Sequence, residues 1–192
     1  MDNKIIVIVG FSSSGKDSIA KYLNDNYDYN FITSVTNRPM RPEESEGDPY
    51  NFITYNDFIL LIDNDDLIEY RTYDTEFGTW FYGVKRCDVL PNQKYVVVLD
   101  LWGLDKFKKH FGDRIQAFFI QVDNETREER AKLRGGFNQI EWDRRLKDDN
   151  RIFNQGDISE QVDFIVPNYD FRECVSDIVR KLYPLHVDKM EG

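Results

Sequence analysis

The stretch Gly10-Phe11-Ser12-Ser13-Ser14-Gly15-Lys16 has the residue types needed to bind a polyphosphate. Two glycines five positions apart, with a lysine after the second, match the spacing of a phosphate-binding loop. Backbone N–H groups of such a loop turn inward around the phosphates, and a helix starting here adds the positive end of its dipole. We therefore predict an ATP site formed by Gly10, Ser12, Ser13, Ser14, Gly15, Lys16, Asp17, Ser18 and, near the end of the chain, Asn168.

Asp17 stands where such loops usually carry a hydroxyl residue that binds magnesium. Magnesium accepts carboxylate oxygens, and an aspartate beside a triphosphate is repelled unless a cation lies between them. We therefore predict that Asp17 holds Mg²⁺ directly or through water and that Ser18 supplies a hydroxyl. The alternative is that Asp17 only complements the dipole at a helix N-terminus.

A second group of polar residues lies between Ser34 and Phe52. Arg38 and Arg41 are three apart among prolines, and Tyr50 follows a Gly-Asp-Pro turn. Two guanidinium forks and a phenol can together bind a phosphate monoester, which has several acceptor oxygens and two charges. The alternative is an exposed basic turn balanced by neighbouring glutamates, which contributes little energetically.

The elements that must position these groups are predicted from apolar runs. Strands buried on both faces are expected at Ile5–Val9, Tyr95–Leu101, Ile115–Val122 and Val162–Asn168. Helical patterns intervene, so the sequence predicts an α/β fold with a parallel sheet flanked by helices. In such sheets ligands bind at the carboxyl ends of the strands. Those ends carry Gly10, Asp100, Asp123 and Asn168.

We expect one domain in four parts. The core comprises residues 1–33, 86–123 and 154–184. A small β-rich lobe, with short strands and frequent turn residues, occupies 34–85. A helical, highly charged lid occupies 124–153, and a polar tail occupies 185–192.

Composition excludes several classes of protein. The formal net charge of −10 over 192 residues argues against a nucleic-acid-binding surface, which needs a basic stripe. Cys87 and Cys174 have no metal-binding or redox spacing, so we expect two buried free thiols in a reducing compartment. No apolar run reaches membrane-spanning length, and no signal peptide is apparent. We expect a cytoplasmic protein.

The whole pattern resembles the guanylate kinase family. The most specific match is Thr36-Asn37-Arg38, Arg41, Glu43-Glu44 and Gly47-Asp48-Pro49-Tyr50-Asn51-Phe52. The resemblance continues, in the family's order, through LIEY (67–70), FYGV (81–84), LDLWG (99–103), the arginine-rich segment and VDFIVPN (162–168). It implies a P-loop kinase core with an inserted monophosphate-binding lobe and a lid. The implied reaction transfers the γ-phosphoryl group of ATP to GMP or dGMP with Mg²⁺.

The resemblance also implies roles for individual residues. The acceptor phosphate would be bound by Arg38, Arg41, Tyr50 and Tyr82, and the base by Ser34, Glu69 and Asp100. Ionised carboxylates suit guanine, because its N1–H and exocyclic amine are donors on one edge. Glu69 and Asp100 could otherwise be only strand-end or helix-capping acids. The residues expected to act on the transferred group are Lys16, Arg41, Arg130, Arg134 and Arg145, whereas Arg127 is expected to pair with glutamates of its own helix.

Some positions depart from the family pattern. Val84 stands where the family has Ser or Thr to hydrogen-bond the base, and Thr79 is predicted to supply that contact instead. Three functions therefore stay open: a kinase for GMP and dGMP, a nucleoside monophosphate kinase of altered or broader base preference, and a non-catalytic module that binds a partner protein. The expected partners are small nucleotides, with no nucleic acid or membrane, in a monomer or homodimer.

Overall fold

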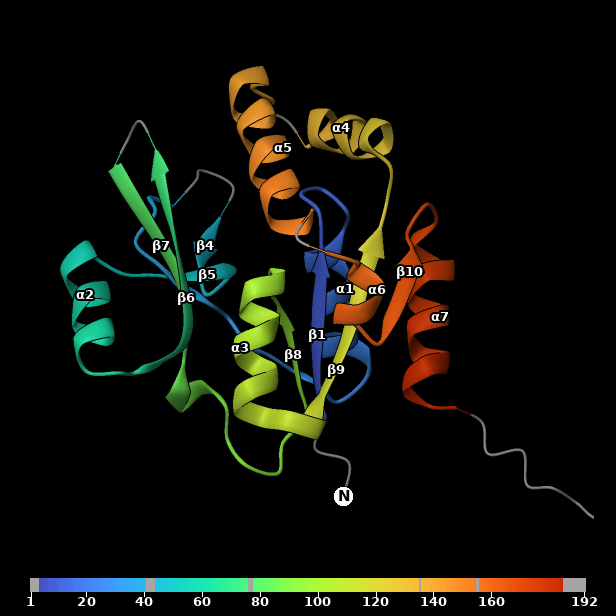
Figure 1. Cartoon of the computed structure of the whole chain (residues 1–192), viewed down its shortest axis with the longest axis horizontal. Coiled ribbons are helices and arrows are strands. Elements are labelled where there is room, and N and C mark those ends of the chain that lie inside the picture. Colours follow the sequence, from blue (N-terminus) through green and yellow to red (C-terminus); the bar gives the residue numbers. More distant parts are fainter. Residues whose placement is uncertain (1–3, 41–43, 76–77, 135, 155, 185–192) are drawn as a thin grey trace, which may run out of the picture.

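The central element is a five-stranded parallel sheet. A computed structural model describes residues 4–40, 44–75, 78–134, 136–154 and 156–184. The sheet has the order β10-β9-β1-β8-β2 (Figure 1). Its strands are β1 (Ile5–Gly10), β2 (Asn30–Phe31), β8 (Tyr95–Val98), β9 (Ile115–Gln121) and β10 (Phe164–Pro167). The predicted α/β class and parallel sheet are confirmed.

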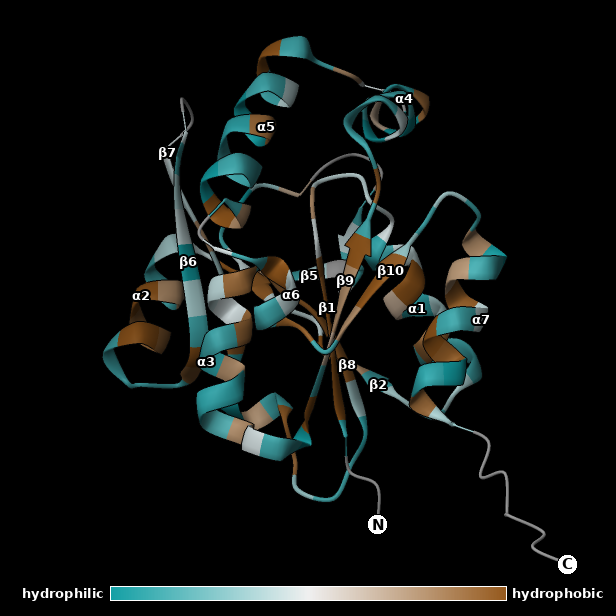
Figure 2. Cartoon of the chain, turned by 45° about the vertical axis from the view of Figure 1, so that its right-hand side comes forward, coloured by the Kyte–Doolittle hydropathy of each residue, from teal (hydrophilic) through white to brown (hydrophobic). Residues whose placement is uncertain are grey.

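Helices cover both faces of this sheet, because its central strand is apolar on both sides. Side chains of β1 alternate between two buried clusters, with Ile6 and Ile8 in one and Ile5, Val7 and Val9 in the other. The first cluster includes residues of α1 (Lys16–Asn26) and α7 (Phe171–Leu182), and the second includes residues of α3 (Leu101–Phe111). Figure 2 shows the hydrophobic residues concentrated along β1, β9 and β10.

A second sheet lies beside the first and belongs to residues 34–85. Its order is β4-β5-β3-β7-β6, with β7 antiparallel to β3 and β6. The strands are β3 (Val35–Thr36), β4 (Ser45–Glu46), β5 (Pro49–Phe52), β6 (Leu67–Thr75) and β7 (Gly78–Lys85). This region also contains the helix α2 (Tyr55–Asp63), which the sequence pattern did not indicate; a capping box between Thr54 and Asp57 starts it.

The arginine-rich segment forms two helices above the carboxyl ends of the parallel strands (Figure 1). They are α4 (Asn124–Leu133), capped by Asp123, and α5 (Gln139–Phe153), capped by Asn138. We call these two helices the lid. The short elements are α6 (Ile158–Gln161) and two 3-10 turns, η1 (Arg86–Asp88) and η2 (Gly112–Arg114). The division into core, lobe and lid stays a prediction, and the predicted tail lies outside the described residues.

Two predicted details change in the structure. The strand expected at Tyr95–Leu101 ends at Val98, because Asp100 caps α3 by accepting the Gly103 N–H at 2.8 Å. Cys174 is buried as expected, but Cys87 is exposed in η1; both are free thiols. No helix in the described ranges is long and apolar enough to span a bilayer.

Candidate active site

One large cavity, of about 1040 Å³, lies at the carboxyl ends of β1 and β8, between the two sheets and the lid. Residues from the predicted ATP loop and from the predicted monophosphate site line it together. They include Gly10, Ser12, Ser13, Lys16, Asp17, Ser34, Arg38, Tyr50, Glu69, Tyr82 and Asp100, with Arg134 and Arg145 from the lid side. The cavity therefore joins sequence segments that are as far apart as β1 and α5.

The phosphate loop is fixed by contacts with the end of β10. Gly15 has φ +94°, and a Cβ there would lie 2.5 Å from Asn168 Nδ2. That amide donates to the Ser14 carbonyl oxygen at 2.7 Å, and Arg130 donates to the Asn168 carbonyl oxygen at 2.7 Å. Only glycine satisfies both the backbone angle and the close approach. Asn168 is thus adjacent to the loop, although it contacts the loop backbone and is not among the residues that line the cavity.

Lys16 and Asp17 are adjacent at the start of α1. Lys16 donates from Nζ to the Phe11 carbonyl oxygen at 2.7 Å. Burial lowers the pKa of Lys16, and the charges of Asp17 and Asp149 oppose that shift. Asp17 is exposed and lines the cavity, whereas Ser18 is exposed outside the lining.

The donors at this point suit magnesium bound together with a nucleotide. Within the described ranges, no three His, Cys, Asp or Glu side chains gather into a preformed metal cage. Magnesium does not need one, because it keeps several waters and is held by one or two carboxylates plus substrate phosphates. The exposed carboxylate of Asp17 beside the loop has the chemistry of such a ligand, and its binding of Mg²⁺ stays a prediction.

Arg127 and Asp149 form a buried ion pair between the lid and the phosphate loop, with 2.8 Å between Nη1 and Oδ2. Asp149 accepts from the Ser12 N–H at 2.9 Å and from Ser12 Oγ at 3.1 Å. Arg127 donates to the Ser12 carbonyl oxygen and to Asn124 and lies 4.6 Å from the Phe11 ring. The prediction that Arg127 pairs with glutamates of its own helix is wrong. Its side chain points inward, where a carboxylate from α5 neutralises it.

The acceptor side has its own buried ion pair. Arg38 is 4% exposed and donates to both Glu44 oxygens, at 3.0 and 2.8 Å. Its guanidinium lies 5.5 Å from the rings of Tyr50 and Phe52, and the Tyr50 ring is 5.4 Å from that of Tyr82. Burial raises the pKa of Tyr50, so its hydroxyl stays protonated and can donate to a phosphate oxygen. Arg38, Tyr50 and Tyr82 therefore converge; Arg41 lies outside the described residues.

Two carboxylates meet at the other end of the acceptor site. Glu69 is 6% exposed, and burial together with the charge of Asp100 raises its pKa to about 8. Asp100 caps α3 and forms an ion pair with Arg71, 2.8 Å between Nε and Oδ2. Ser34 lines the same cavity, at the start of β3. This end presents two carboxyl groups to the cavity, and their role in binding a base stays a prediction.

The lid arginines occupy three different environments. Arg134 is exposed and lines the cavity, and its charge opposes protonation of Lys16. Arg145 also lines the cavity and donates to Glu141 at 2.9 Å. Arg130 is not among the cavity-lining residues, because its guanidinium donates to the backbone of Asn168 and Ser14. Arg130 therefore contacts the phosphate loop and the end of β10 from outside the cavity.

Comparisons with known proteins show the family of this chain. The family model described as guanylate kinase matches residues 2–183. The chain belongs to the guanylate kinase family. A guanylate kinase of Synechococcus sp. is 28% identical over 186 residues, covering 94% of this chain and 82% of that protein. One from Bacteroides thetaiotaomicron is 33% identical over 138 residues, covering 70% and 67%.

A solved guanylate kinase structure from Anaplasma phagocytophilum gives the same result. It has a TM-score of 0.69 and 26% identity, and the match covers 94% of this chain and 85% of that one. Membership of the guanylate kinase family identifies the protein as an ATP-dependent nucleoside monophosphate kinase.

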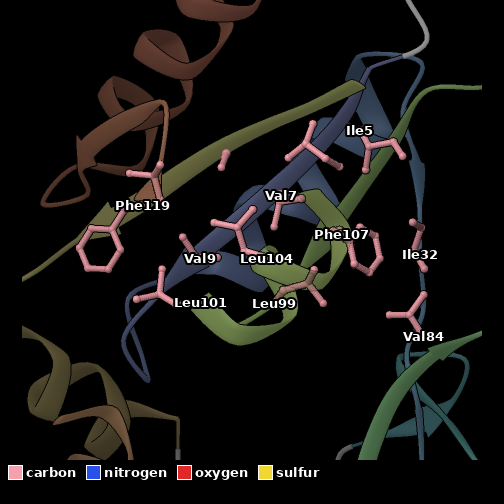
Figure 3. Close-up of a cluster of buried hydrophobic side chains, with 14 of the residues drawn as sticks. Ile5, Val7, Val9, Ile32, Val84, Leu99, Leu101, Leu104, Phe107 and Phe119 are labelled. Atoms are coloured by element: carbon pink, nitrogen blue, oxygen red, sulfur yellow. The ribbon is translucent and has the colours of Figure 1, made fainter. Parts of the chain in front are cut away.

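The departure from the guanylate kinase pattern at Val84 has a structural explanation. Val84 is fully buried and belongs to the main apolar cluster, which also contains Ile32, Leu99 and Phe107 (Figure 3). The position of Thr79 does not support the predicted contact with the base. It lies near the tip of the β6–β7 hairpin, donates to Asp74 at 3.0 Å, and is not among the described residues that line the cavity.

The cavity-lining residues that the sequence analysis did not assign include Arg71, Tyr73 and Asp149. The first two were detectable, because Glu69, Arg71 and Tyr73 alternate along β6 and so share one face. Burial raises the pKa of Tyr73 to about 12, and Asp100 adds to that shift. Asp149 left no such signal, since its partner Ser12 is 137 residues away.

Proposed function

We propose that the protein transfers the γ-phosphoryl group of ATP to GMP or dGMP, giving ADP and GDP or dGDP. One observation carries this proposal. A single cavity is lined both by the phosphate loop with Lys16 and by the acceptor residues Arg38, Tyr50 and Glu69. Family membership supports the same reaction.

The donor nucleotide would lie on the phosphate loop. Inward N–H groups of the loop and the start of α1 would bind the phosphates of ATP, and Lys16 would exchange its bond to the Phe11 carbonyl for a phosphate oxygen. The predicted metal ligand is Asp17, whose bound Mg²⁺ would neutralise charge on the phosphates.

The acceptor would lie across the cavity. Arg38, Tyr50 and Tyr82 would hold its phosphate, together with Arg41 as predicted from sequence. Glu69, once ionised, would accept from guanine N1–H and from the exocyclic amine, with Asp100 and Ser34 nearby. A phosphate oxygen of the acceptor is then held where it can attack the γ-phosphorus while the bond to the β-phosphate oxygen breaks.

No side chain needs to form a covalent intermediate in this reaction. Charge spreads over the equatorial oxygens of the transferring group, so cations that converge on it supply most of the catalysis. Lys16 and the lid residues Arg134 and Arg145 are the proposed cations, and Arg130 acts through the loop. The lid also excludes water, which would otherwise accept the phosphoryl group.

The test is a panel of ribo- and deoxyribonucleoside monophosphates with Mg-ATP, followed by ADP release, with Lys16→Ala as the inactive control. Turnover of GMP and dGMP alone supports the proposal. Turnover across several bases would support the second reading, a kinase of broader preference, which the buried Val84 favours because it offers the base no hydrogen bond. No turnover with any monophosphate would support the third function, a non-catalytic module that binds a partner protein.

The proposed metal ligand has its own test. Asp17→Ala should raise the Mg²⁺ concentration needed for half-maximal activity, because one carboxylate ligand is lost. Asp25→Ala, an exposed acid farther along α1, is the matched control. Equal magnesium titrations for the two variants would assign Asp17 only to the helix dipole.

A further inference from the structure

The inward face of β6 carries three polar side chains in a row. Glu69, Arg71 and Tyr73 alternate along the strand, and all three line the cavity. Across the ladder, Glu69 pairs with Val84 and Arg71 with Tyr82. The predicted base-reading carboxylate and a guanidinium are thus one pleat apart on the same surface.

Guanine needs donors as well as acceptors from its site. Its N1–H and exocyclic amine are donors, which Glu69 can satisfy, but O6 and N7 are acceptors on the adjoining edge. Strand β7 supplies no donor at the position opposite Glu69, because Val84 is apolar and fully buried in the core. Thr79 hydrogen-bonds Asp74 near the hairpin tip. Ser34 lines this end of the cavity and can donate one hydrogen bond, so a second donor for the O6/N7 pair must come from another residue.

Arg71 has the right chemistry and is held in place. Its Nε lies 2.8 Å from Asp100 Oδ2, and its guanidinium lies 4.9 Å from the Trp102 ring at the start of α3. The side chain is 26% exposed, so it is partly desolvated but open to the cavity. A guanidinium ordered before binding loses less entropy when it hydrogen-bonds a ligand. Asp100 neutralises its charge, which suits recognition of an uncharged base.

We propose that Arg71 determines base specificity by donating to O6 and N7 of guanine while Glu69 accepts from N1–H and the exocyclic amine on the adjoining edge. This inference rests on the proposed function. An arginine fork matches the O6/N7 pair, whereas adenine presents an amine donor in place of O6, and pyrimidines have no N7. Arg71 therefore takes over the hydrogen-bonding task that Val84 cannot perform.

The experiment compares GMP, 7-deaza-GMP and IMP as acceptors. The first analogue lacks N7, and IMP lacks the exocyclic amine. For the wild type, each loss should reduce kcat/KM roughly tenfold, since a site built for a hydrogen bond is left with an unpaired group. In Arg71→Met the ratio of GMP to 7-deaza-GMP should fall to about one, while the ratio of GMP to IMP persists. In Glu69→Gln the ratio of GMP to IMP should fall to about one, while the ratio of GMP to 7-deaza-GMP persists.

Two further variants separate base reading from support of the fold. Arg71→Lys keeps a positive charge beside Asp100 but loses the fork, so its preference for GMP over 7-deaza-GMP should be weakened. Arg86→Met breaks a different arginine–aspartate pair, with Asp65, outside the cavity, and should leave both ratios unchanged. An unaltered ratio of GMP to 7-deaza-GMP in the Met and Lys variants would overturn the proposal.

The proposed function and the role of Arg71 are tested by different measurements. Turnover of GMP by the wild type tests the proposed function on its own. If it is absent, the proposed function fails, and the role of Arg71 fails with it. If it is present but the wild type treats GMP and 7-deaza-GMP alike, only the role of Arg71 is overturned.

Discussion

The cavity has a phosphoryl-donor side, formed by the phosphate loop, and an acceptor side, formed by residues 34–85 and Asp100. The two sides hold their charged groups in different ways. On the donor side, the phosphate loop is fixed by residues distant in sequence: Asp149 binds Ser12, and Asn168 binds Ser14 across 154 residues. On the acceptor side, Arg38 pairs with Glu44 only six residues away, within one turn-rich segment. The Arg127–Asp149 and Arg38–Glu44 ion pairs are both buried, but only the first joins two helices of the fold. The partly exposed Arg71–Asp100 pair links β6 to the start of α3 on the acceptor side.

The two sides are therefore organised differently before an anionic ligand binds. The donor loop is shaped before nucleotide binds, because tertiary contacts fix its backbone and its glycines. On the acceptor side, cations already face carboxylates, so a phosphate or base must bind beside or displace those partners. We therefore expect loss of the loop's tertiary contacts to affect stability, loss of Lys16 to affect the chemical step, and acceptor-side substitutions to affect pH dependence and substrate choice.

The largest expected effect follows loss of the carboxylate at Asp149. Asp149→Ala leaves Arg127, which is 2% exposed, without its charged partner. Breaking a buried pair by removing one partner costs about 3–5 kcal/mol. Urea denaturation should show that loss in the free energy of unfolding, and the KM for ATP should rise because Ser12 loses its acceptor.

The adjacent residue provides the control. Asp148 pairs with Arg144 and Arg151 on the same helix and is 27% exposed, so solvent screens these pairs and Asp148→Ala should cost less than about 1 kcal/mol. Replacing both members of the buried pair, as Arg127→Met with Asp149→Leu, should recover much of the lost stability. Equal costs for Asp148→Ala and Asp149→Ala would contradict the distinction between the two sides.

The second effect concerns Lys16. Lys16→Ala should lower kcat/KM by about a hundred- to a thousandfold, the usual cost of removing one group that stabilises transition-state charge. Stability should not fall, because burial disfavours the charged form of this lysine in the folded protein. GMP binding, measured by calorimetry without ATP, should stay unchanged. Weakened GMP binding would show that the two sides are not independent.

The sequence predicted the parallel sheet and the loop because both depend on local patterns. Short runs of β-branched residues such as Ile5–Val9 favour buried strands, and the glycine spacing before Lys16 is typical of a loop with a strand before it and a helix after it. The convergence of Arg38, Tyr50 and Tyr82 also followed, through the resemblance, from residue types and order.

The remaining contacts depend on which distant surfaces meet, and local patterns do not encode that. Arg127 has glutamates nearby in its helix, yet its partner is Asp149 on the next helix. Thr79 was assigned to the base because it is polar and close to Val84, but the two-residue period of β7 and its position near the hairpin tip take it away from the cavity. The helix α2 was missed, because its apolar residues lie among turn residues and short strands.

The third prediction tests the acceptor side through pH. Glu69 has a pKa of about 8 against an ordinary value of 4.5, because burial and Asp100 disfavour its ionised form, while Arg71 partly opposes them. The folded state therefore holds a proton that the unfolded state loses near pH 4.5. The resulting stabilisation is fully present below pH 4.5 and is lost as the pH rises through 8. Between pH 5 and 8.5 the wild type should lose more stability than Glu69→Gln.

Substrate binding should show the opposite trend with pH. Guanine donors favour the ionised carboxylate, so the KM for GMP should fall severalfold as the pH rises from 7 to 8.5, and Glu69→Gln should flatten that profile. The KM for ATP, bound on the donor side, is the internal control and should not follow this change. A flat KM for GMP in the wild type would remove Glu69 from base recognition.

The smallest expected effect belongs to Glu141, which pairs with Arg144 and Arg145 at 2.7 and 2.9 Å on the lid. These arginines lower the pKa of Glu141 to about 2, with Arg144 the larger cause, so its stabilising effect is present above pH 4.5 and is lost as the pH falls through about 2. The Glu141 side chain is 36% exposed and its pairs lie within one helix, so solvent screens them.

Glu141→Gln should therefore cost less than about 1 kcal/mol at both pH 7 and pH 4, measured by urea denaturation. It should change kcat by less than about twofold, because Arg145 stays in the cavity without this partner. A cost near that of Asp149→Ala would mean that lid pairs within one helix matter as much as the pair that joins the lid to the phosphate loop, and the contrast between local and long-range pairing would fail.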